Sequence, residues 1–221
     1  MKKVKFSFDK ELDMLNFWQA CNGFALWEND KKPIRQKFID KWRGKSYEES
    51  KSEIAFHFDL LYNSEFINIF QNSLEKGWRE IEPKYFERLE KLTQKPIYVK
   101  KFDGLITTSG RCYANNKNNS FLVSIRRPYL HALRTCGHEL LHLQVNNYYW
   151  NKMENQLGMK GAAELSEGLT TLLNPNFRDL WIAEDMGYKE HKDLREYIEI
   201  EWDKDKDFER LIHKGIEKIK D

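Results

Sequence analysis

The chain has 221 residues, of which 33% are charged and 14% aromatic, and its formal net charge is +2. A charge this close to neutral is not typical of proteins that bind nucleic acid or an anionic membrane surface. The aromatic content argues against disorder and predicts a globular protein with a sizeable core.

The N-terminal segment and the cysteines bear on where the protein works. The segment MKKVKFSFDKELDML lacks the apolar run of about seven residues found in secretory signals, and no stretch approaches the roughly eighteen apolar residues of a membrane helix. The cysteines are odd in number and widely spaced: Cys21, Cys112 and Cys136. We therefore expect free thiols and a reducing cytoplasm, with no membrane association.

Residues 1–95 predict a helical N-terminal part. Apolar and polar residues alternate from Val4 to Phe8, which indicates a short strand over residues 1–8. From Asp9 to about Lys95 the apolar residues recur at helical spacing. The apolar runs begin at Leu12, Ile34 (after Pro33), Ile54, Phe66 and Ile81, and the expected breaks are Gly44, Gly77 and Pro83.

The periodicity changes at Pro96, where a small mixed or antiparallel sheet is expected. The predicted strands are Ile97–Val99, Leu105–Thr108 and Phe121–Ile125. Between the last two strands, the polar run Asn115–Ser120 is a strong turn signal.

Helices are expected to follow this sheet. Pro128 suits the first turn of an apolar helix that runs to about Asn147, where Asn146 and Asn147 would end it. A second helix is predicted over Gly161–Leu173, ended by Asn174-Pro175, with further helices around 189–201 and 206–219. The predicted class is α+β, mainly helical, with a helical part (1–95) and a second part (96–221) packed as one compact unit.

The first of these helices carries the motif His138-Glu139-Leu140-Leu141-His142. Positions i and i+4 lie on one face of a helix, so the imidazoles of His138 and His142 can bind one metal ion. Glu139 between them can act as a general base toward a water molecule that the metal activates. Five residues thus predict a zinc site and a base.

A catalytic zinc ion needs a third protein ligand and an open position. Helical spacing places Glu164, Glu167 and Thr171 on one face of the predicted helix over Gly161–Leu173. A carboxylate on that face could meet the two histidines across a pair of helices.

The motif, followed by Leu165-Ser166-Glu167-Gly168-Leu169, resembles the gluzincin metallopeptidases, in which a downstream helix supplies a glutamate ligand, often within Asn-Glu-Gly. Ser166 stands where Asn is usual. The resemblance, which covers about residues 97–175, implies a zincin-like fold with Zn²⁺ bound by His138, His142 and Glu167. Glu164 is the alternative, as third ligand or as a residue that orients a ligand imidazole.

Other zincin classes fit less well. Metzincins extend the motif with Gly and His, but Val145 and Tyr148 occupy those positions. Peptide deformylases use an upstream cysteine, yet the residues around Cys112 do not resemble that motif. We interpret Cys112 and Cys136 as packing residues and His131 as a polar helix residue.

The resemblance also implies an edge strand that binds extended peptide, expected near Gly110–Ala114 and paired with Phe121–Ile125. It further implies a Tyr or His downstream that stabilises the oxyanion. Tyr188 and His191 are the candidates, ahead of Tyr148 and Tyr149, which are expected to end the motif helix.

These features predict a cytoplasmic zinc metallopeptidase that acts on a peptide or protein substrate. The alternative is a zincin-like metal-binding or toxin-type protein without peptidase turnover, with a protein partner bound through the helical N-terminal part. Glu139 favours the enzyme, because a purely structural zinc site gains nothing from a base at that position.

Overall fold

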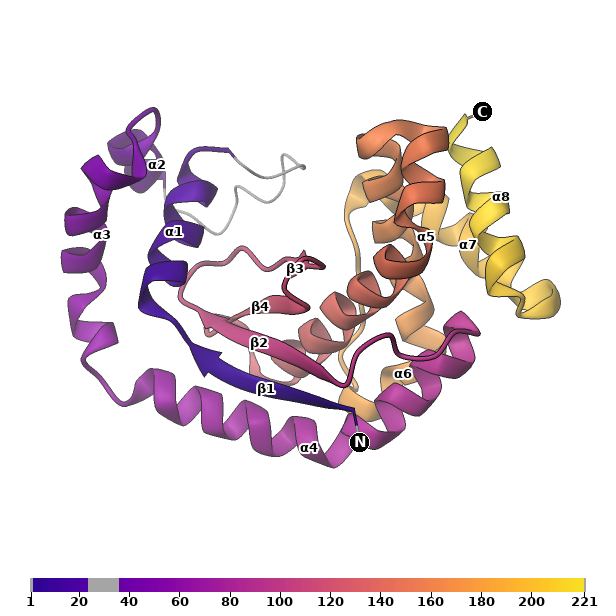
Figure 1. Ribbon diagram of the computed structural model, residues 1–221, viewed down its shortest axis with the longest axis horizontal. Coiled ribbons are helices and arrows are strands. Elements are labelled where there is room, and N and C mark those ends of the chain that lie inside the picture. The colour runs from indigo at the N-terminus through magenta and orange to yellow at the C-terminus, as the bar shows by residue number, and fades with distance from the viewer. Residues whose placement is uncertain (1, 24–35, 221) are drawn as a thin grey trace.

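The computed structural model describes residues 2–23 and 36–220, and its strands form one mixed sheet in the order β1-β2-β4-β3 (Figure 1). Strand β1 (Lys3–Phe8) pairs in parallel with β2 (Lys101–Thr107), which pairs in parallel with β4 (Ser120–Ser124). Strand β3 (Ala114–Asn115) pairs with β4 in antiparallel. The N-terminal strand and a small sheet before the motif helix are thus confirmed.

The first three helices pack together beside the sheet. These are α1 (Lys10–Cys21), α2 (Gln36–Trp42) and α3 (Tyr47–Tyr62). Their apolar cluster includes Phe17, Trp42 and Phe58, which is separate from the main core. Gly44 lies in the turn between α2 and α3, as expected, whereas Pro33 and Ile34 lie outside the described residues.

The remaining helices surround the main core. Helix α4 (Phe66–Thr93) runs along the sheet beside β1 (Figure 1). The later helices are α5 (Tyr129–Leu169), η2 (Thr170–Leu172), α6 (Leu173–Trp181), η3 (Lys189–His191), α7 (Lys192–Asp205) and α8 (Phe208–Lys220). Phe6 of β1, Trp78 of α4 and Leu140 of α5 share this core, so segments on both sides of residue 95 build it.

The fold is therefore α+β, mostly helical with a small mixed sheet. No helix within residues 2–23 and 36–220 carries a stretch that is apolar enough for a bilayer-spanning segment.

Two predicted breaks and one predicted strand are wrong. Gly77 and Pro83 both lie inside α4. Gly77 is tolerated in the helix because it leaves room for the Tyr129 hydroxyl. Pro83 is tolerated because it is exposed, so the backbone carbonyl one turn earlier, which proline leaves without a helical hydrogen bond, can bind water. Residues 97–99 form no strand, because side chains bind the neighbouring backbone: Tyr148 Oη donates to the Pro96 carbonyl at 2.7 Å, and the Ile97 amide donates to Glu90.

The predicted helix ends after the motif are also wrong. Asn146 and Asn147 lie within α5, because the buried residues Tyr149 and Met153 continue the apolar stripe of the helix beyond them. The helix instead breaks at Gly158, whose φ of 70° favours glycine. Asn174 and Pro175 do not end a helix but lie in the first turn of α6, which begins at Leu173.

Candidate metal centre

One face of the N-terminal part of α5 lines a pocket of about 410 Å³. The side chains on this face are spaced three and four residues apart: His131, Arg134, Thr135, His138 and Glu139. Residues 110–112, which precede β3, form a second wall, and the segment 184–188 after α6 forms a third. The period of the helix therefore presents the motif to a cavity.

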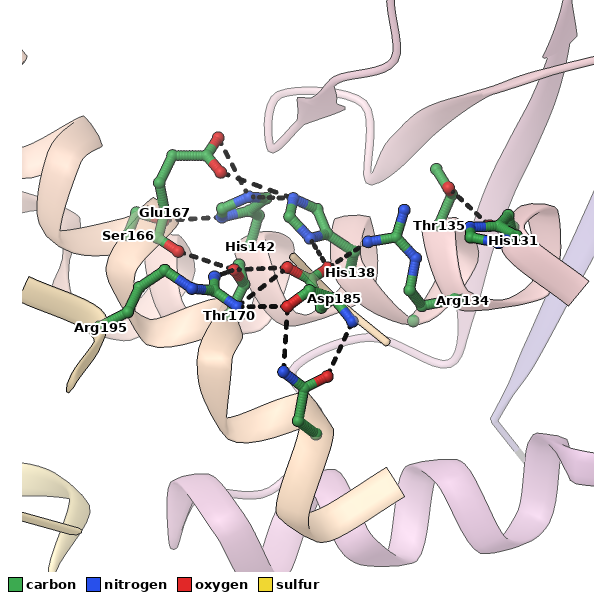
Figure 2. A network of polar contacts seen from close by, with 12 residues as sticks. His131, Arg134, Thr135, His138, His142, Ser166, Glu167, Thr170, Asp185 and Arg195 are labelled. Carbon is green, nitrogen blue, oxygen red and sulfur yellow. Dashed lines mark hydrogen bonds and ion pairs between the residues drawn. The ribbon is translucent and has the colours of Figure 1, made fainter. Parts of the chain in front are cut away.

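The break at Gly158 brings Glu167 to the two histidines. In one straight helix, residues 142 and 167 would lie about 37 Å apart at 1.5 Å per residue. Instead, Oε1 of Glu167 lies 3.4 Å from Nε2 of His142, and Oε2 lies 3.6 Å from Nε2 of His138. The ligand atoms of the three residues all lie within 4.8 Å of one another, a set that could hold a metal ion (Figure 2).

Hydrogen bonds fix the orientation of both imidazoles. Nδ1 of His138 lies 2.8 Å from Oδ2 of Asp185, and a carboxylate can only accept, so this nitrogen donates. Nδ1 of His142 lies 2.8 Å from Oγ of Ser166, which itself donates to Oδ1 of Asn146. The Ser166 hydroxyl therefore accepts a hydrogen bond from Nδ1–H of His142, so Nε2 is the nitrogen of each histidine that can bind a metal ion.

This arrangement needs a cation. The two Nε2 atoms lie 3.0 Å apart, and the Glu167 carboxylate faces them with Oε2 buried and without a hydrogen-bond donor among the described residues. Lone pairs brought together in this way repel each other unless a proton or a metal ion lies between them. Two imidazoles and one carboxylate are a common ligand set for a catalytic metal ion, so the residues fit that group.

The charged groups around the site also favour a bound cation. Burial disfavours the charged form of His138, but Asp185, Glu167 and Glu139 outweigh it and raise the pKa of His138 to about 9. Burial likewise raises the pKa of Glu167, yet the two histidines outweigh it and leave that pKa below its ordinary value. The acidic residues thus make the site attractive to positive charge.

Asp185 is the centre of a buried polar network (Figure 2). Besides His138, its carboxylate pairs with Arg134 at 2.5 Å and with Arg195 at 3.3 Å. Its backbone is held by Asn174, whose side chain bonds both the amide and the carbonyl. Burial raises the pKa of Asp185, but His138 and the two arginines outweigh it and hold the pKa well below its usual range.

Glu139 is buried at the wall of the same pocket. Burial raises its pKa, and the positive charges of His138, His142 and Arg127 only partly offset this effect. A carboxylate whose pKa is raised in this way is suited to accept a proton near neutral pH.

The other predicted site residues differ in their placement. Glu164 is half-buried, lies outside the ligand set and does not line the pocket, so the geometry favours Glu167 as the third ligand. Tyr188 lines the pocket. His191 is buried, with its ring 5.6 Å from that of Tyr188, and it does not line the pocket, which favours Tyr188 as an oxyanion donor.

The structure also places the two cysteines near the motif and the expected edge strand. Cys112 lines the pocket, but burial raises the pKa of its thiol to about 11, and it lies outside the ligand set. Cys136 is buried in the core, as expected. The edge strand expected over Gly110–Ala114 is wrong in extent, because the strand that pairs with β4 is Ala114–Asn115, with one further backbone hydrogen bond from the Leu122 amide to the Tyr113 carbonyl.

Sequence reasoning missed the residues that support the ligands. Asp185 lies in an irregular segment after α6, where no periodicity or spacing points to His138. Ser166 departs from the family string in the sequence, and only the structure shows that it binds His142. Asn146 lies inside the helix that it is predicted to end, and it positions Ser166.

The chain matches no family model, no curated protein and no solved structure. Its function is therefore inferred from the geometry of the site.

Proposed function

We propose that this chain is a cytoplasmic, zinc-dependent metallopeptidase with a zincin-like fold and a gluzincin-like ligand set. The observation that carries the proposal is the convergence of His138, His142 and Glu167 on one point of a pocket that Glu139 also lines. A zinc ion held by these three residues would supply Lewis acidity, which would lower the pKa of a water molecule and polarise a carbonyl group.

The side chains of the chain account for the remaining chemistry. Glu139 accepts the proton of the attacking water and delivers it to the leaving amine. Tyr188, in the same pocket, donates a hydrogen bond to the oxyanion. Asp185 and Ser166 hold the two imidazoles in the tautomer that binds a metal.

The alternative is a metal-binding protein without turnover that acts through a protein partner. The observation in its favour is the exposure of two large apolar side chains on α3: Phe56 is 86% exposed and Leu60 is 87% exposed. A buried carboxylate beside the ligand set favours the enzyme, because it has no role in a purely structural site.

The decisive variant is Glu139→Gln, with Glu184→Gln as a control in the same pocket. Glu139→Gln should abolish hydrolysis of a fluorogenic peptide mixture while the metal content stays at the wild-type level. Glu184→Gln should retain activity, because the Glu184 carboxylate is exposed, pairs with Arg178 and lies outside the ligand set. Undiminished activity of Glu139→Gln would refute the mechanism.

The metal and its third ligand are tested by elemental analysis. Zinc, iron, copper and nickel should all be measured, because imidazole suits each of them. Glu167→Ala should lower the zinc content more than Glu164→Ala does. The reverse order would reassign the third ligand.

A further inference from the structure

A wide apolar groove of about 530 Å³ lies between α4 and the segment that joins β4 to α5. Its apolar lining residues are Leu61, Phe66, Ile69, Phe70, Ile125 and Tyr129. Phe66 is 65% exposed and Ile69 is 59% exposed, although both are large apolar side chains. Clustered apolar exposure beside a cavity is typical of a binding surface.

This groove lies next to the candidate metal pocket, and Arg127 lines both. The side chain of Arg127 is exposed and contacts Cys112, and its charge reaches Glu139. No carboxylate of residues 2–23 or 36–220 forms an ion pair with it. Within the described residues, a cation that forms no ion pair thus lies between the apolar groove and the proposed base, Glu139.

On the basis of the proposed function, we propose that the groove and Arg127 select the substrate. The substrate is an extended polypeptide with a large apolar side chain, such as Leu, Ile or Phe, that packs in the groove. An acidic residue near this side chain pairs with Arg127, and the scissile bond lies in the metal pocket beyond. Removal of the apolar side chain from water and pairing of the acidic residue with Arg127 both stabilise the complex with such a segment.

The groove is tested with Ile69→Ser, and with Phe56→Ser as the matched control. Both are exposed apolar residues on helices, but Phe56 lies outside the groove. Wild-type cleavage sites in a peptide mixture should be enriched in an apolar and an acidic residue on the same side of the cut. Ile69→Ser should lower kcat/KM for such peptides about tenfold or more, because a Leu-sized side chain loses its burial. Phe56→Ser should not change it.

The charge is tested with Arg127→Glu, and with Arg126→Glu as the control, since Arg126 lines neither cavity. Arg127→Glu should lower kcat/KM about tenfold for a peptide that carries the apolar and the acidic residue. This variant should instead prefer the same peptide with lysine in place of the acidic residue. Peptide affinity should change in the same sense when binding to each variant is measured by fluorescence anisotropy in the inactive Glu139→Gln background.

The outcomes separate this inference from the proposed function. If the wild type cleaves peptides but Ile69→Ser and Arg127→Glu change neither the cleavage profile nor the affinity, the inference is overturned and the peptidase stands. If Glu139→Gln binds the apolar, acidic peptide but the wild type cleaves none, the groove stands and the peptidase fails. If no peptide is bound or cleaved, both are overturned.

Discussion

Removing the Asp185 carboxylate should destabilise the fold and weaken metal binding at the same time. The side chain of Asp185 is 1% exposed, and it lies between Arg134 and Arg195, which are 12% and 8% exposed. In Asp185→Ala, two largely buried guanidinium groups lose their counter-charge, and Nδ1 of His138 loses its acceptor.

The size of the effect follows from this burial. Removing one partner of a buried ion pair costs about 3–5 kcal/mol, because the charge that remains is neither paired nor hydrated. In a protein of this length, each kcal/mol shifts Tm by about 2–4 °C, so the loss should be about 6–20 °C. Loss of a residue that orients a ligand imidazole typically lowers metal affinity about 10- to 100-fold.

Two measurements separate these effects. Thermal unfolding in excess chelator reports the loss of the ion pairs alone, and competition with a chromophoric chelator reports zinc affinity. Glu184→Ala is the matched control, because its ion pair with Arg178 is exposed and should contribute less than about 1 kcal/mol. Asp185→Asn keeps an oxygen that can accept the hydrogen bond from Nδ1–H of His138, so this variant should retain more zinc affinity than Asp185→Ala does.

An Asp185→Ala protein that unfolds at the wild-type Tm in chelator would refute the reasoning on buried charge. Zinc affinity equal to that of the wild type would show that Asp185 does not orient His138.

Three further results are expected. Ser166→Ala should lower zinc affinity about tenfold with little change of Tm in chelator, because it removes the acceptor of His142 Nδ1; an unchanged affinity would contradict this role. Gly137→Ala should lower Tm, because the added Cβ would lie 2.5 Å from the buried ring of Trp181. Such overpacking destabilises the fold by about 1–3 kcal/mol, which outweighs the gain of about 1 kcal/mol in helix propensity. Burial raises the pKa of Glu82, so the folded state binds a proton at this carboxyl group more tightly than the unfolded state does. The stabilisation that comes from this proton is present below the ordinary pKa of 4.5 and is lost as the pH rises from there through the raised pKa. Glu82→Gln, which keeps an acceptor for the Val4 amide, should therefore raise Tm at pH 7 more than at pH 4, and an equal change at both values would contradict the assignment.

Local signals in the sequence predicted much of the secondary structure. The alternation before Asp9 gave β1, the polar run 115–120 gave the turn before β4, and the last two helical patterns became α7 and α8. Breaker residues were less informative. Pro83 and Asn147 lie inside helices, because the packing of a long apolar stripe outweighs the cost of a single residue, which is about 3 kcal/mol for a proline in a helix interior and less than about 1 kcal/mol for an asparagine.

The sequence alone determined the spacing that places His138, Glu139 and His142 together, because a helix fixes the positions i, i+1 and i+4 without help from distant residues. Only the tertiary structure decided what completes the set. Glu167 reaches the histidines because the chain turns at Gly158, and Asp185 reaches His138 from a segment without regular structure. Contacts of this kind depend on where the core places each element, and no local pattern records that placement.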